Sequence, residues 1–106
     1  MKKLLTAMAV FGFVSGAATA VSADGEKVFQ RSGCIACHVV GGKGGRVGPS
    51  LEKIGEKSAD YIRTAIVDPN ANPVEGYPKG VMPQNYGTQL SDEDLNALVE
   101  FLGKQK

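Results

Sequence analysis

Both cysteines and the single histidine of this 106-residue chain lie in one segment, Cys34-Ile35-Ala36-Cys37-His38. A C-x-x-C-H segment is the attachment signature of a c-type haem. In such a segment the two thiols bond to the porphyrin vinyl groups, and the adjacent imidazole binds the iron from one face. Because all three side chains must meet one rigid macrocycle, we expect them on a single short helical turn. The motif therefore predicts a fold built around one haem c, held by Cys34, Cys37 and His38.

Three other interpretations of the motif are weaker. A structural zinc site needs about four Cys, His or carboxylate ligands, and the chain has no second C-x-x-C or H-x-x-H. A thioredoxin-like dithiol is expected within a βαβ pattern, whereas the flanks of this motif are Gly-rich and helix-like. A disulfide between Cys34 and Cys37 would close too small a loop to stabilise the fold much. Haem attachment is favoured because it accounts for every cysteine and histidine in the chain.

The N-terminal segment has the pattern of a secretory signal. Lys2 and Lys3 give it a positive start, and an apolar stretch follows from residue 4 to about residue 14. Small residues then offer two cleavage positions. We expect a signal peptide over residues 1–23, and thus export to the periplasm.

Cleavage after Ala23 is favoured because it leaves Asp24 to begin the first helix. Cleavage after Ala20 is one alternative, and retention of the segment as an uncleaved membrane anchor is the other. The remaining residues, 24–106, form one small domain. A domain of this size has marginal stability without a disulfide, a metal or a cofactor to add to its core. A covalently held haem would supply a large apolar surface on which its side chains pack.

The charge of the domain limits the classes of partner that it can bind. Without Lys2 and Lys3, ten basic side chains face eleven acidic ones, a net charge of −1. Nucleic-acid binding proteins need a strong basic surface, so this class is excluded. The near balance of charge also predicts that encounters with partners depend weakly on ionic strength, unless the charges cluster in space.

Hydrophobic spacing and capping residues predict an all-α domain of about four short helices. Asp24, Ser50, Ser58 and Ser91 are the expected N-caps. Apolar stripes predict the buried faces of the later helices. The helices are expected over residues 24–32, from residue 50 to about 55, over 58–68, and from 91 to near the C-terminus.

Two segments are predicted to be irregular. Residues 39–49 hold five glycines, so they form either a flexible surface loop or a backbone laid close against the haem edge, where side chains would clash. Residues 69–90 hold four prolines and three glycines. This long loop is nevertheless expected to be ordered, because it has apolar side chains to bury, namely Val74, Tyr77, Val81, Met82 and Tyr86.

The second axial ligand of the iron can be approached by elimination. No second histidine exists, which leaves a methionine, a lysine, a tyrosine, the N-terminal amine or an open position. Met1 and Met8 leave with the signal, so Met82 is the one methionine in the domain. A lone methionine usually fills a gap in a core, but beside a C-x-x-C-H haem we predict Met82 as ligand, with Pro83 stiffening its backbone. Ligation by His and Met raises the reduction potential.

With these motifs in place, the chain resembles the small class I cytochromes c over essentially all of residues 24–106. The stretch from Tyr61 to Leu102 is similar to the cytochrome c domain fused to subunit II of some haem–copper oxidases. The motifs that carry the resemblance are Gly25 and Phe29, the Cys34–His38 segment, Val47-Gly48-Pro49-Ser50-Leu51, Val81-Met82-Pro83, Leu90-Ser91-Asp92 and Leu98-Val99-Glu100-Phe101-Leu102.

The resemblance implies the cytochrome c fold, with the first and last helices crossed where Gly25 and Phe29 meet the Phe101 region. It also implies that the Pro49 carbonyl accepts a hydrogen bond from the His38 ring. Arg46 and polar groups on the Met82 loop would neutralise the haem carboxylates.

The sequence thus predicts an electron carrier rather than an enzyme: a periplasmic monohaem c-type cytochrome that shuttles single electrons. Its partners would be redox proteins, namely membrane or periplasmic oxidoreductases, with no nucleic acid and no small-molecule substrate. One alternative is a dedicated haem subunit of an oxidoreductase complex. The other is a haem enzyme or gas sensor with an open iron site.

Overall fold

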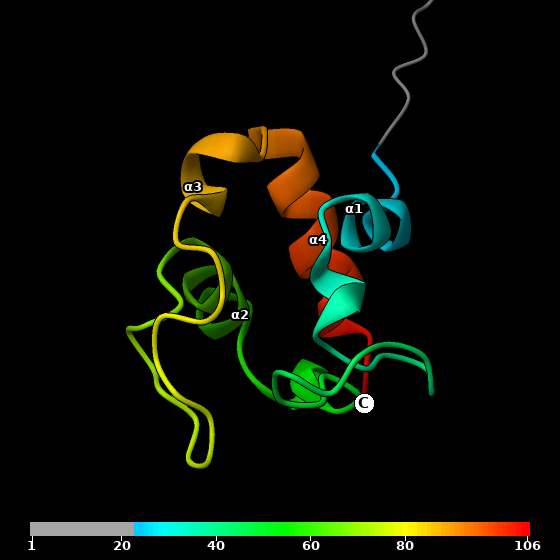
Figure 1. The fold of residues 1–106 in the computed structure, drawn as a ribbon. Coiled ribbons are helices and arrows are strands. Elements are labelled where there is room, and N and C mark those ends of the chain that lie inside the picture. The colour runs from blue at the N-terminus through cyan, green and yellow to red at the C-terminus, as the bar shows by residue number, and fades with distance from the viewer. Residues whose placement is uncertain (1–22) are drawn as a thin grey trace, which may run out of the picture.

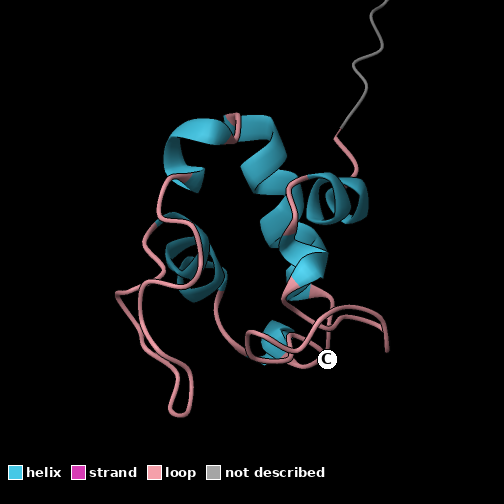
Figure 2. Ribbon diagram, viewed as in Figure 1, coloured by secondary structure: helices cyan, strands magenta, loops and turns pink. Residues whose placement is uncertain are grey.

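The computed structural model describes residues 23–106, which form a helical domain (Figure 1). The signal segment expected over residues 1–23 lies outside this range except for its last residue. Within the range no strand occurs, and the only β-type pairing is an isolated bridge between Val40 and Lys43 (Figure 2). The all-α prediction is confirmed. The elements are α1 (Gly25–Arg31), the 3₁₀ turns η1 (Cys34–Ala36) and η2 (Ile54–Glu56), α2 (Ala59–Val67), α3 (Tyr86–Gln89) and α4 (Asp92–Gly103).

Three of the four expected N-caps begin their helices as predicted. The Asp24 carboxylate accepts hydrogen bonds from the backbone N–H groups of Glu26 and Lys27 at the start of α1. Ser58 and Ser91 cap α2 and α4 through their hydroxyl oxygens. Each cap satisfies backbone donors that the first turn of a helix leaves free.

The first and last helices cross as the resemblance implies. A Cβ at Gly25 would meet the Ala97 carbonyl oxygen and lie 2.5 Å from Phe101 Cβ, so only glycine allows α1 and α4 to approach this closely. Beside the crossing, the rings of Phe29 and Phe101 pack with centroids 5.8 Å apart. Aromatic pairs at this separation add to the stability gained from burial alone.

The hydrophobic core lies between α1, α2, α3 and α4. The hydrogen bond from Arg63 Nη2 to Asn96 Oδ1, at 2.8 Å, adds a polar link between α2 and α4 at the surface. Among the described residues no helix has both the length and the apolar character needed to cross a bilayer. The core residues are Val28, Phe29, Ile62, Ile66, Tyr86, Leu98, Val99 and Leu102.

The helix expected from Ser50 is replaced by a shorter turn. The Ser50 hydroxyl does accept a hydrogen bond from Glu52 N, at 3.2 Å, but the helical turn η2 begins only at Ile54. The Gly55 N–H donates to the Gln105 carbonyl at 2.7 Å, where a longer helix would use a carbonyl of its own. Contact with the C-terminal segment therefore takes the Gly55 N–H that a continuous helix from Ser50 would bond internally, and only the short turn η2 forms.

The long loop departs from expectation in two ways. Residues 86–89 form α3, a single turn whose first residue, Tyr86, is only 8% exposed. Three of the apolar side chains expected to be buried are exposed instead, with fractions of 42% for Val74, 40% for Tyr77 and 55% for Val81. These three side chains border the same cavity, and that cavity is the reason they lack a covering partner.

Candidate functional site

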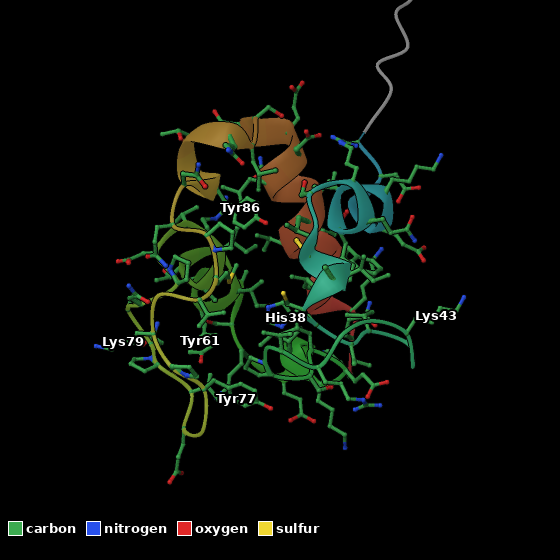
Figure 3. The ribbon with its side chains drawn as sticks, in the orientation of Figure 1. His38, Lys43, Tyr61, Tyr77, Lys79 and Tyr86 are labelled. Carbon is green, nitrogen blue, oxygen red and sulfur yellow. The ribbon has the colours of Figure 1, made fainter. Side chains whose placement is uncertain are left out.

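A cavity of about 400 Å³ is lined by residues of η1, η2, α2, α4 and the loop before α3. Its lining is mainly apolar. His38 and Tyr61 reach it from different elements, and Lys43 projects away from the body (Figure 3). Its apolar lining includes Phe29, Leu51, Ile54, Ile62, Ile66, Val74, Val81, Leu98 and Leu102, and its sulfur and nitrogen donors are Cys34, Cys37, His38 and Met82.

The C-x-x-C-H segment forms one compact turn, as the motif requires. Gly33 precedes it with φ of 85°, a left-handed conformation that glycine adopts without strain. The N–H groups of Cys37 and His38 both donate to the Cys34 carbonyl, at 3.2 and 3.0 Å. As a result Cys34, Cys37 and His38 all line the cavity, and both cysteines are free thiols.

Burial controls the acidity of one thiol. Desolvation raises the pKa of the Cys34 thiol above its ordinary value, a backbone hydrogen bond lowers it, and the neighbouring Cys37 raises it further. Desolvation is the largest of these effects, because the Cys34 side chain is half-buried at the cavity.

The imidazole of His38 is held by the backbone of the following loop. Its Nδ1 lies 2.7 Å from the Pro49 carbonyl oxygen, and since a carbonyl only accepts, Nδ1 carries the proton. The hydrogen bond implied by the resemblance is therefore present. It leaves Nε2 as the nitrogen with a lone pair for a metal and fixes the ring plane, as backbone carbonyls do for many ligating histidines.

The glycines after His38 pack beneath the motif. A Cβ at Gly44 or Gly45 would collide with the carbonyl oxygens of His38 and Ala36, and one at Gly48 would lie 2.7 Å from His38 Cε1. The sequence suggested either a flexible loop or a backbone at the haem edge. The second half of the loop forms a backbone layer against the C-x-x-C-H turn, and Gly48 also lines the cavity.

Hydrogen bonds fasten this layer to the turn. Gly45 N donates to the Ile35 carbonyl at 2.9 Å, and Gly48 N donates to the Cys37 carbonyl at 2.7 Å. The turn that presents the thiols is thus supported from behind by main chain alone. No periodicity in the sequence could have indicated these contacts, because glycine has no side chain to form a pattern.

Met82 lines the cavity from the loop that precedes α3. It is half-buried and packs against the core. Its backbone carbonyl accepts a hydrogen bond from Gln84 Nε2 at 2.7 Å. The structure thus brings Met82 and His38 to the same cavity, while the role of Met82 as iron ligand stays a prediction.

The structure places Arg46 differently from the other predicted site residues. Arg46 is exposed and is absent from the cavity lining. Lysines stand at the cavity instead, namely Lys53, Lys57 and Lys79, and Lys57 Nζ lies 5.0 Å from the centroid of the Tyr61 ring. These lysines were not singled out from the sequence, because an isolated lysine gives no pattern there.

The described residues fit a haem. The thiols of Cys34 and Cys37 and the oriented imidazole of His38 line the cavity from one turn, and the Met82 thioether lines it from the loop before α3. Apolar side chains, several of them exposed, make up most of the remaining lining. An apolar macrocycle with a metal at its centre matches both the donor set and the lining.

Two known proteins are similar to this chain in sequence, and the names of both include cytochrome c. The chain is 31% identical to cytochrome c oxidase subunit 2 of Alkalihalophilus pseudofirmus over 96 aligned positions, which cover 78% of the chain and 25% of the relative. It is 36% identical to the menaquinol:cytochrome c reductase cytochrome c subunit of Bacillus subtilis over 83 positions, covering 78% of the chain and 28% of the relative. The expected similarity to an oxidase subunit is confirmed.

The chain spans about a quarter of the length of these two relatives. No solved structure matches it significantly. The cytochrome c family, however, matches residues 22–106, which include every described residue. The apolar cavity, the C-x-x-C-H turn that faces it and this match lead to one conclusion: the chain belongs to the cytochrome c family, which implies a covalently bound haem c.

Proposed function

We propose that the chain is an exported one-electron carrier whose haem is held by Cys34 and Cys37 and ligated axially by His38 and Met82. The observation that carries the proposal is the His38 ring, fixed by Pro49 at 2.7 Å inside an apolar cavity that Met82 also lines. The family supports electron transfer in general terms. Export rests on the signal pattern of the N-terminal segment, with Lys2 and Lys3 before an apolar stretch.

The bound haem would supply an iron that alternates between two oxidation states. The chain's own residues do the rest. The Pro49 carbonyl keeps the His38 proton on Nδ1, which makes Nε2 the ligand and raises its basicity. The Met82 thioether supplies a neutral, soft donor that favours the reduced state.

The remaining lining excludes water and competing ligands. Buried apolar side chains such as Ile62 and Leu98, exposed by 2% and 1%, keep the interior dry. With both axial positions filled by protein, electron transfer requires no ligand exchange, and oxygen or peroxide finds no open position. This is the physical ground for proposing a carrier rather than a haem enzyme or a gas sensor.

The test is the replacement of Met82, with Val81→Ala as a matched control on the same loop. We expect Met82→Ala to lower the midpoint potential by on the order of 0.1–0.3 V, part of the roughly 0.8 V span covered by axial ligands. The variant should also bind CO when reduced, whereas the unsubstituted protein and Val81→Ala should not. An unchanged potential in Met82→Ala would overturn the ligand assignment, and rapid CO binding by the unsubstituted protein would favour an open-site function.

A second candidate is a permanent haem subunit of an oxidoreductase complex. It is favoured by the relatives, one named as a subunit of an oxidase and the other as a subunit of a reductase. In either case the proposed partners are redox proteins at or outside the cytoplasmic membrane. Purification from native membranes distinguishes the two, because a subunit would co-purify with its complex in fixed ratio and a free shuttle would not.

A further inference from the structure

The segment that carries Met82 is tied to the rest of the fold at one point before it. Every residue from 71 to 81 is exposed. In the described part of the chain, residues 72–82 have one hydrogen bond to a residue that precedes them, from Gly80 N to Asn70 Oδ1 at 3.0 Å. Segments with few buried contacts unfold locally most readily. We therefore expect this hydrogen bond to contribute strongly to the position of Met82.

The acceptor of this hydrogen bond is itself well anchored. Asn70 is half-buried, lines the cavity and stands just after α2, whose Ile66 is only 5% exposed. The turn that contains Asn70 is closed by a hydrogen bond from Ala71 N to the Asp68 carbonyl at 3.0 Å. Asn70 therefore stands on a hydrogen-bonded turn directly after α2, and the Gly80 N–H that its amide oxygen accepts is two residues from Met82.

The tie divides the loop into two parts. Residues 70–80 project from the domain as a narrow loop with both limbs meeting at its base (Figure 1). With the base closed, only the five residues 81–85 separate the hydrogen-bonded Gly80 from the buried Tyr86. Without it, the free segment would run from residue 71 to 85, which is three times longer. Under the ideal-chain relation, a threefold shorter segment is about fivefold easier to bring to a fixed point.

We propose that Asn70 is a positioning residue that holds Met82 at the iron, by accepting the Gly80 N–H and closing the base of the projecting loop. The inference rests on the proposed ligation by Met82. What the position requires is an oxygen acceptor of the right length, not an amide as such. Aspartate would keep this acceptor, and leucine would keep the shape without it.

The experiment measures how fast imidazole replaces Met82 in the oxidised, haem-loaded protein, by stopped-flow absorption at saturating imidazole. We expect Asn70→Leu to raise the limiting rate about fivefold, the effect of one net hydrogen bond. Asn70→Asp should stay within about twofold of the unsubstituted protein, because it retains the acceptor. Asn85→Leu is the matched control, since Asn85 is exposed, lies outside the cavity lining and makes no capping hydrogen bond through its side chain, and it should leave the rate unchanged.

A second measurement does not depend on the iron ligand, and its first comparison needs no variant. In the reduced, unsubstituted protein, the Gly80 amide should exchange with solvent more slowly than the neighbouring amides of Lys79 and Val81. Asn70→Leu should remove this protection, and Asn70→Asp should keep it. Equal exchange at all three amides in the unsubstituted protein would overturn the proposal.

The outcomes separate the two proposals. If Met82→Ala leaves the imidazole kinetics as they are, the ligand assignment fails and the role of Asn70 at the iron fails with it. If Met82→Ala abolishes the slow replacement phase but Asn70→Leu matches the unsubstituted rate, only the role of Asn70 is overturned. That role is also overturned if Asn70→Asp behaves like Asn70→Leu, because the acceptor oxygen would then not be the active group.

Discussion

Replacing Gly25 with alanine tests whether close contact of α1 and α4 determines the stability of the domain. The added Cβ would meet the Ala97 carbonyl oxygen and stand 2.5 Å from Phe101 Cβ, below the 3.0 Å that real Cβ atoms respect. The oxygen belongs to the backbone, so the helices themselves must move apart. Overpacking costs about 1–3 kcal/mol, and the better helix propensity of alanine returns less than about 1 kcal/mol at a helix end.

We therefore expect Gly25→Ala to lower the free energy of unfolding by about 2 kcal/mol, a drop of roughly 10 °C in melting temperature for a domain of this size. The measurement is urea and thermal unfolding of the haem-loaded protein, followed by circular dichroism. Gly103→Ala is the matched control, because it makes the same change in a helix where a Cβ meets nothing within 4 Å. It should stabilise by about 0.5–1 kcal/mol. If Gly25→Ala were as stable as Gly103→Ala, the argument from close approach would be wrong.

Two further substitutions test the supports around the cavity. Tyr86→Phe removes the hydroxyl that donates to the Ser32 carbonyl at 2.7 Å and should cost about 1 kcal/mol in urea unfolding. Burial is the main reason that the pKa of Tyr86 lies above 10. The stability that the neutral Tyr86 hydroxyl contributes is therefore complete below pH 10 and is lost as the pH rises through the folded-state pKa. Above pH 10 the melting temperature should fall less steeply with pH for Tyr86→Phe than for the unsubstituted protein, and equal slopes would contradict this. Gly48→Ala places a Cβ 2.7 Å from His38 Cε1. It should weaken the hydrogen bond from His38 to the Pro49 carbonyl and thereby raise the midpoint potential measured by voltammetry. Gly87→Ala, where the nearest contact of the added Cβ is at 3.6 Å, should leave the potential unchanged.

The parts of the fold that could be predicted from sequence are those with local causes. Asp24, Ser58 and Ser91 cap helices through their own side chains, and such caps are visible in three or four consecutive letters. The C-x-x-C-H turn is equally local, since its three chemical groups and its helical hydrogen bonds lie within five residues. Elimination singles out Met82, because the domain holds one methionine, and Met82 does line the cavity, while its role as iron ligand stays a prediction.

The parts that could not be predicted depend on contacts between distant segments. The helix expected from Ser50 is reduced to the turn η2, and the Gly55 N–H goes to the Gln105 carbonyl, a partner 50 residues away that no window of sequence reveals. The single turn α3 is too short for a periodic pattern and contains Gly87, which argues against a helix. It forms because the buried Tyr86 anchors it to the Ser32 carbonyl, across 54 residues.

The glycine-rich loop behind the C-x-x-C-H turn has two halves that differ in the room around their backbone. A Cβ at Gly41 or Gly42 would meet nothing within 4 Å, although both glycines have a positive φ that strains other residues, and the tip closes on itself through the paired hydrogen bonds of Val40 and Lys43. Two residues after Gly42, at Gly44, any side chain would strike the motif's backbone. A linker coupled to the outward-pointing Lys43 (Figure 3) would therefore attach the domain to another protein or to an electrode directly behind the C-x-x-C-H turn, with every glycine of the loop kept.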